Sequence, residues 1–122
     1  MSIVQELKDI AAGMEFDQFE EYLKANPDLK FERADSCRCP IATWLKHKHK
    51  DGGFVKSGFY VRANRLEVVK YYDQEGRTVT ASTISQPWVQ RFIDAVDNVV
   101  PTLPKGNTIT GREALRVLRR LR

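Results

Sequence analysis

The helix start at Cys39-Pro40 constrains the fold of this chain more than any other feature of the sequence. Proline is typical of the first position of a helix, where its missing amide hydrogen costs nothing, and Cys39 before it would be the cap residue. The turn signal Asp51-Gly52-Gly53 requires this helix to end near Lys48. The sequence therefore predicts a helix over about 40–48, which sits at the centre of the core and has one apolar face formed by Ile41, Trp44 and Leu45.

Two amphipathic helices are expected before this segment. The first is capped by Ser2 and stopped by Gly13, and the second runs from about Glu15 to Ala25. Asn26-Pro27 ends the second helix, because the residue before a proline is pushed out of the helical region. The two helices are short and closely connected, which indicates an αα-hairpin. Residues 28–35 alternate weakly and are compatible with a short strand or a loop.

After the glycine turn the composition becomes typical of β-structure. Aromatic and β-branched residues at 54–55 and 58–62, then at 66–72 and 77–82, indicate three consecutive antiparallel strands that form a meander. Residues 63–65 and 73–76 are the expected hairpin loops between these strands.

Two further helices are expected in the last third of the chain. Ser85 is the expected cap of the first of them, and Thr110 with Glu113 forms a capping box for the second, after a proline-containing linker. The predicted fold is a single α+β domain over residues 1–122, with the order α-α-α-β-β-β-α-α.

The net charge of +4 hides a strong asymmetry along the chain. Acids dominate residues 1–35, whereas bases dominate 36–70 and, less strongly, 71–122. No apolar run approaches the roughly 20 residues that span a bilayer, so no membrane segment is expected. The charged, helical N-terminus is unlike a signal peptide, and two cysteines one residue apart fit a reducing compartment, so we expect a cytoplasmic protein.

A metal site is the first chemical hypothesis, because both cysteines and both histidines of the chain lie close together: Cys37, Cys39, His47 and His49. Zinc prefers such ligands, but structural sites typically use wider spacings than the single intervening residue found here. In a helix the two histidines would point about 200° apart. We therefore expect no bound metal, and these four residues are the only candidate ligands. The sequence also lacks phosphate-loop and dinucleotide motifs, so no cofactor is expected.

A reactive cysteine is the second hypothesis. Cys39 at a helix N-terminus, preceded by Arg38, has an environment that favours the thiolate. However, His47 and His49 lie about 12–15 Å further along the same helix, too far to act as its base. The sequence therefore predicts a protein that is not an enzyme, with no catalytic residues.

Nucleic-acid binding is the alternative function. Three helices followed by a β-hairpin follow the order of a winged helix, in which the third helix enters the major groove. The phosphate contacts would be basic residues of this helix, of the hairpin and of the last helix: Lys46, Lys48, Lys50, Lys56, Arg62, Arg65, Arg116, Arg119 and Arg120. Against this, the N-terminal part of the third helix is poor in groups that read bases.

Protein binding is the favoured function. Tyrosine and arginine are typical interface anchors, and the predicted hairpin is rich in aromatic residues, of which the candidate anchors are Phe59, Tyr60, Tyr71 and Tyr72. We therefore expect a non-enzymatic module with a protein partner. The sequence does not define its oligomeric state.

Three short motifs carry a resemblance to other proteins: Cys39-Pro40-Ile41-Ala42, the helix that begins Pro87-Trp88-Val89, and the terminal helix after Ile109-Thr110. In these motifs the chain resembles small proteins of unassigned role from bacteria and their phages. The resemblance implies a phage or prophage origin, and with it a host-directed inhibitor or a virion component in the bacterial cytoplasm. It implies no activity and no functional residue.

Overall fold

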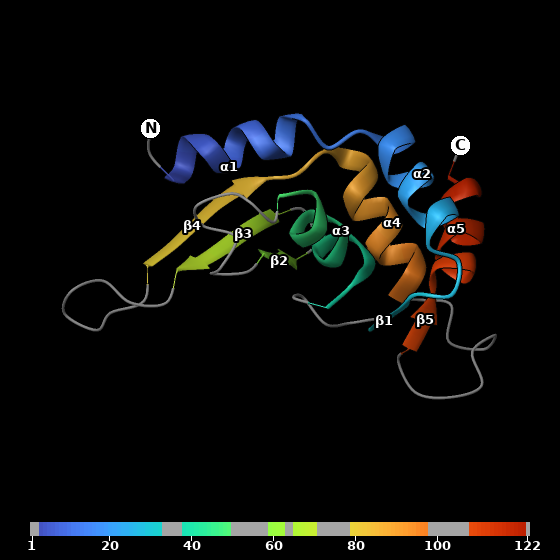
Figure 1. Ribbon diagram of the computed structural model, residues 1–122. Coiled ribbons are helices and arrows are strands. Elements are labelled where there is room, and N and C mark those ends of the chain that lie inside the picture. Colours follow the sequence, from blue (N-terminus) through green and yellow to red (C-terminus); the bar gives the residue numbers. More distant parts are fainter. Residues whose placement is uncertain are drawn as a thin grey trace.

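The computed structural model describes residues 3–32, 38–49, 59–62, 65–70, 79–97 and 108–121, and confirms the mixed α+β class (Figure 1). The helices are α1 (Ile3–Ala12), α2 (Phe16–Ala25), α3 (Pro40–Lys48), α4 (Pro87–Asp97) and α5 (Gly111–Arg119). The strands are β1 (Lys30–Glu32), β2 (Phe59–Arg62), β3 (Arg65–Lys70), β4 (Val79–Ile84) and β5 (Thr108–Thr110).

The strands form two separate antiparallel sheets. Strands β2, β3 and β4 lie in that order in a three-stranded sheet, where Arg62 pairs with Arg65 and Leu66 pairs with Thr83. Strands β1 and β5 form a second sheet, in which Phe31 pairs with Ile109. The predicted order of elements lacks this second sheet. Its strands are only three residues long, which is too short to show an alternating pattern.

Helices α2, α4 and α5 gather at one end of the molecule, and the larger sheet with α1 packed along it forms the other (Figure 1). Helix α5 packs against α2 and α4 at the helical end. Helix α1 runs along β4, and α3 contacts β2 and β1 between the two ends. We call these regions the helical end and the sheet end.

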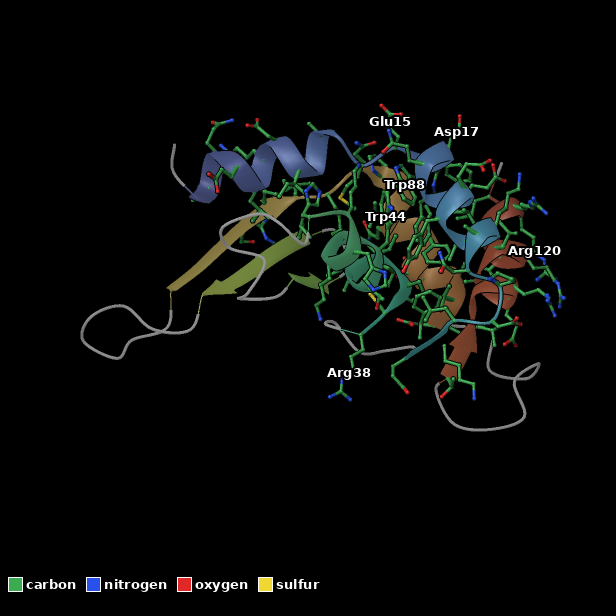
Figure 2. The ribbon with its side chains drawn as sticks, in the orientation of Figure 1. Glu15, Asp17, Arg38, Trp44, Trp88 and Arg120 are labelled. Atoms are coloured by element: carbon green, nitrogen blue, oxygen red, sulfur yellow. The ribbon has the colours of Figure 1, made fainter. Side chains whose placement is uncertain are left out.

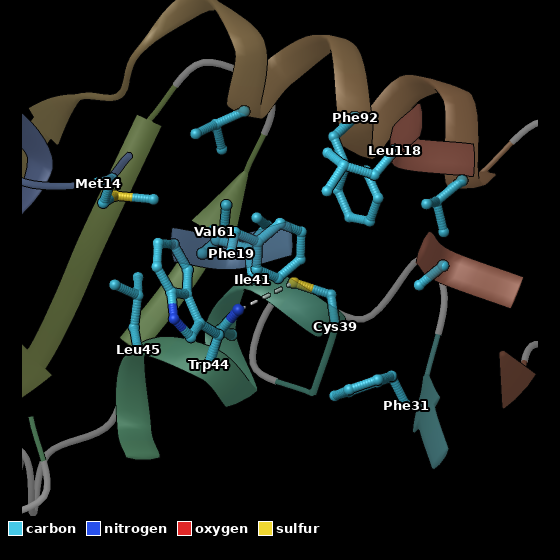
Figure 3. Packing of buried hydrophobic residues seen from close by; sticks show 14 of the residues in the cluster. Met14, Phe19, Phe31, Cys39, Ile41, Trp44, Leu45, Val61, Phe92 and Leu118 are labelled. Atoms are coloured by element: carbon cyan, nitrogen blue, oxygen red, sulfur yellow. Dashed lines mark hydrogen bonds between the residues drawn. The ribbon is translucent and has the colours of Figure 1, made fainter. Parts of the chain in front are cut away.

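Aromatic side chains form the centre of the core, and α3 supplies part of it as predicted. Phe19 is fully buried, with its ring centroid 5.0 Å from Trp44, 5.7 Å from Trp88 and 5.1 Å from Phe92. Each such side chain removes about 150–250 Å² from water, so this cluster dominates the packing energy. The indole N–H of Trp88 donates to the carbonyl of Met14 at 3.3 Å, which satisfies the polar atom of that ring. Figure 3 shows Trp44, Phe19 and Phe92 in this core.

Local capping signals decide where α3 and α5 begin. The Sγ atom of Cys39 accepts the N–H of Ala42 at 3.4 Å, and α3 starts at Pro40, as predicted. The predicted capping box of α5 is also confirmed: the hydroxyl of Thr110 accepts the N–H of Glu113, and the carboxylate of Glu113 accepts the N–H of Thr110. These interactions satisfy amides that the first helical turn leaves without a partner.

The prediction that Ser85 caps α4 is wrong. Strand β4 continues to Ile84, and α4 begins only at Pro87, so Ser85 lies too far before the helix to cap it. Its hydroxyl is buried and makes no hydrogen bond within the described part of the chain. The next residue, Gln86, instead fixes this junction, because its side-chain amide donates to the carbonyls of Ala11 and Ala12.

Candidate binding surfaces

The two described ends of α3 place its cysteine and its histidines in different environments. Cys39 lies in the core at the N-terminal end, with 8% of its surface exposed (Figure 3). His47 lies at the other end, where its Nδ1 atom is 2.8 Å from the hydroxyl oxygen of Tyr22. Burial, followed by the charge of Lys48, lowers the pKa of His49 below its usual value. Cys39 thus caps the helix at one end, and His47 joins α3 to α2 at the other.

These positions bear directly on the metal hypothesis. Within the described ranges, no group of three or more His, Cys, Asp or Glu residues is arranged to hold a metal ion. Cys37 lies outside the described residues. Among the other candidate ligands, Cys39 is bound to the backbone of its own helix and His47 to Tyr22.

The winged-helix hypothesis requires an exposed N-terminal half of α3, because that part of a recognition helix contacts the bases. Here Pro40, Ile41, Ala42, Trp44 and Leu45 are all buried. Helix α3 therefore serves as a core helix over most of its length.

The basic residues near the C-terminus of α3 contact other parts of this protein. The Nζ atom of Lys48 donates to Oε1 of Gln18 at 2.8 Å and lies 5.2 Å from the centroid of the Trp44 ring. Lys46 is partly buried. The two remaining lysines predicted for this region, Lys50 and Lys56, lie outside the described residues.

The sheet end exposes an apolar side chain beside an oriented arginine. Ile84 is 64% exposed at the end of β4, and Arg65 is its directly opposite partner on β3. The Nε atom of Arg65 donates to the hydroxyl of Ser82 at 2.7 Å, which holds the guanidinium against the sheet. Arg62 on β2 is the next residue in register with Arg65. We call the residues Arg62, Arg65 and Ile84 the sheet row.

The predicted aromatic anchors fall partly in this sheet. Phe59 pairs with Val68 and Tyr60 pairs with Glu67 in the β2–β3 ladder. Tyr71 and Tyr72 lie outside the described residues. Ile84 was not among the predicted site residues, because the expected third strand ends at Ser82. The β-branched pair Thr83-Ile84 before the predicted helix cap was the signal that could have extended the strand.

The helical end exposes charges of both signs on two adjacent helices. Helices α2 and α5 are antiparallel neighbours, joined by an ion pair of Arg119 with Glu20 at 3.3 Å and one of Arg112 with Asp28 at 3.7 Å. We use the name α2–α5 face for the exposed charged residues of these two helices: Asp17, Glu21, Lys24, Arg112, Arg116, Arg119 and Arg120.

Two arginines of this face differ from the others. Arg116 and Arg120 are exposed, and their guanidinium groups make no ion pair or hydrogen bond with any residue that the structure describes. Figure 2 shows Arg120 directed away from the body of the molecule at this end. Arg65 is the first residue of β3 in the three-stranded sheet, so the predicted phosphate contacts of the hairpin lie on a different element from those of α5.

None of the described helices is long and apolar enough to cross a membrane. No protein-family model matches the chain, and no curated protein or solved structure is significantly similar to it.

Proposed function

We propose that this protein is a non-enzymatic protein-binding module, and that its partner docks on the sheet row, where β3 begins and β4 ends. The exposure of Ile84 carries this proposal. A β-branched residue that is 64% exposed leaves most of its apolar surface in water, whereas Val61 and Leu66 of the same sheet are buried. Covering a side chain of this size contributes about 1.5–3 kcal/mol at most.

Arg65 makes this apolar position a better anchor. Arginine is enriched among the residues that dominate protein–protein binding energy. The hydrogen bond to Ser82 holds the Arg65 side chain in one orientation before any partner arrives. Binding therefore loses less side-chain entropy than it would with a freely rotating arginine. Phe59 and Tyr60 belong to strand β2, next to β3. Successive residues of a strand lie on opposite faces, so only one of these two predicted anchors shares the face of Arg65 and Ile84.

The non-enzymatic reading is supported by the positions of the reactive side chains. The Cys39 thiol accepts a helix amide in the core, and His47 bonds to Tyr22 at the far end of the same helix. Catalysis by a cysteine requires a base within hydrogen-bonding distance of the nucleophile. A structural role accounts for both side chains.

Nucleic-acid binding is the second candidate, and it is favoured by Arg116 and Arg120, which no described residue neutralises. The acids of α2 weigh against it, because Asp17, Glu20 and Glu21 lie beside the arginines of α5 and repel a phosphate backbone. The burial of Ile41 and Ala42 weighs against the winged-helix mode of binding.

The resemblance to small bacterial and phage proteins identifies the kind of partner that we propose. It is a bacterial protein, bound by this chain as a host-directed inhibitor, or another component of a virion. The resemblance assigns no residue to this role, so the sheet row is assigned from the exposure of Ile84 and the orientation of Arg65.

A pull-down from bacterial lysate, with and without nuclease, tests the proposal. The variants are Ile84→Lys and, as a matched control, Val4→Lys, because Val4 on α1 is the other large apolar residue exposed in the described part of the chain. We expect a protein partner that survives nuclease treatment, is retained by Val4→Lys and is lost with Ile84→Lys. Capture that disappears with nuclease would identify nucleic acid as the ligand. Equal capture by both variants would show that the partner docks elsewhere.

A further inference from the structure

The α2–α5 face carries acids and arginines with the same spacing. Asp17 and Glu21 are four residues apart on α2, and Arg116 and Arg120 are four residues apart on α5. Residues four apart in a helix lie on the same side, with Cβ atoms about 5–6 Å apart. All four side chains are exposed. The face therefore presents an acidic pair and an arginine pair with matching separations. Within the chain Glu21 already pairs with the exposed Lys24 at 3.3 Å, a weak surface contact that an arginine of a partner would replace.

The molecule already shows how an acidic helix fits along α5. Glu20 near the middle of α2 contacts Arg119 near the end of α5, and Asp28 after α2 contacts Arg112 near the start of α5. The two helices are therefore antiparallel, and α2 neutralises one side of α5. Arg116 and Arg120 are the arginines of α5 that this arrangement leaves without a described ion-pair partner.

We infer that the occupant of the α2–α5 face is a second copy of this chain, placed by a two-fold axis parallel to the two helices. In this arrangement α2 of each copy lies antiparallel to α5 of the other. Asp17 then meets the partner's Arg120, and Glu21 meets the partner's Arg116. The symmetry forms each contact twice, as in every isologous interface.

Charge complementarity selects this occupant. A polyanion is attracted by the arginine pair and repelled by the acidic pair beside it. A purely basic surface is attracted by the acidic pair and repelled by the arginine pair. Both pairs find opposite charges only against a surface whose acidic and basic pairs are in the reverse order. A second copy related by the two-fold axis presents such a surface. Exposed ion pairs are individually weak and screened by salt, so the dimer is weak and sensitive to ionic strength.

Sedimentation equilibrium of the purified chain tests this inference by charge reversal and recombination. Asp17→Lys/Glu21→Lys places lysines against the partner's arginines, and Arg116→Glu/Arg120→Glu places acids against the partner's acids. We expect a wild-type dimer at low salt that dissociates at about 0.5 M salt. Each reversed variant alone should dissociate at least about tenfold more readily.

Mixing the two reversed variants gives the decisive measurement. In the mixed dimer one contact is wild type and the other has both charges exchanged, so dimer formation should return to the wild-type level. A chain with all four substitutions should also dimerise. Lys8→Glu/Arg38→Glu is the control with the same change in net charge as the arginine reversal, because these exposed bases lie on α1 and just before α3, outside the face. It should dimerise like the wild type.

Three results would overturn the inference: a wild-type chain that stays monomeric at low salt and high concentration, a mixture of reversed variants that stays monomeric, or a control that loses the dimer. Far-ultraviolet circular dichroism of every variant establishes that it is folded. The measurement uses the purified chain alone, so it is independent of any partner that the sheet row binds.

Discussion

The helical end and the sheet end of this molecule expose different chemistry. At the helical end, α2 and α5 bury most of their apolar side chains and expose acids and arginines, several of which pair with one another. At the sheet end, Ile84 is exposed beside Arg65. A charged face supports weak, salt-sensitive contacts, whereas an exposed apolar side chain gains free energy when a partner covers it. The two ends are therefore suited to different partners.

The two ends also differ in how the backbone is held. At the helical end, the N–H of Gly111 donates to the carbonyl of Leu29 at 2.8 Å, and the N–H of Arg112 donates to that of Pro27 at 2.9 Å. The start of α5 is thus fixed to the turn after α2, next to the β1–β5 pairing. At the sheet end, Ile84 and Arg65 are held by a strand ladder at the surface. Substitutions at the helical end should therefore have the larger effect on stability.

Gly111→Ala is expected to have the largest effect of the substitutions considered. A Cβ atom at this position would lie 1.9 Å from the carbonyl oxygen of Asn26, and backbone atoms of this kind cannot move without breaking the contacts of the turn. We expect a loss of about 3 kcal/mol or more in the free energy of unfolding, measured by urea denaturation.

Gly13→Ala is the matched control for this prediction. Its Cβ atom would lie 3.4 Å from the carbonyl oxygen of Asp9, which is an ordinary contact. We expect a change within about 0.5 kcal/mol. If Gly111→Ala is as stable as Gly13→Ala, the start of α5 does not approach the turn as closely as described.

The helices were predicted well from the sequence, because nearby capping and turn residues determine where they begin and end. Pro40 marks the start of α3, and Thr110 with Glu113 marks the start of α5. Helix α3 ends at Lys48 as predicted, although the turn signal at 51–53 lies outside the described residues. The cap of α4 was predicted wrongly at Ser85. A serine two residues before a proline resembles a helix cap, and this local pattern does not show that the preceding strand continues to Ile84.

The non-local features could not be predicted in this way. The β1–β5 sheet joins Phe31 to Ile109, and no local pattern shows that two segments so far apart will pair. The close approach of Gly111 to Asn26 depends on the same long-range contact. For the candidate surfaces, the types of binding residue, arginine and aromatic, were predicted from the sequence. It could not show that Lys48 and Arg119 are used within the fold whereas Arg116 and Ile84 are not.

Tyr22→Phe tests the connection between the helical end and α3. Its effect on the free energy of unfolding should be smaller than that of Gly111→Ala and larger than that of Ile84→Lys. The substitution removes the hydrogen bond between the Tyr22 hydroxyl and Nδ1 of His47 while it keeps the ring packed against Phe19 and Phe31. Because water can replace the lost partner at this exposed site, we expect a loss of about 0.5–1 kcal/mol at neutral pH.

The same variant should change the dependence of stability on pH. Burial raises the pKa of Tyr22 from 10.0 to about 12. Between these values the unfolded chain loses the hydroxyl proton and the folded chain retains it, so the contribution of Tyr22 is complete below pH 10 and is lost as the pH rises towards 12. The difference in stability between wild type and Tyr22→Phe should therefore shrink over this range in urea denaturation. A difference that stays constant from pH 9 to about 12 would contradict the role assigned to burial.

Ile84→Lys should have the smallest effect on stability, and this result would separate the two ends most clearly. Because 64% of the Ile84 surface is already in water, its replacement removes little buried area, and we expect a change within about 0.5 kcal/mol in urea denaturation. Val61→Ala on strand β2 of the same sheet is the contrasting variant. Val61 is 4% exposed, and its truncation should cost about 2 kcal/mol in the free energy of unfolding. If Ile84→Lys destabilised the protein as much as Val61→Ala, Ile84 would be part of the core. The sheet row would then have no apolar surface to offer a partner, and the assignment of the sheet end as a docking surface would fail.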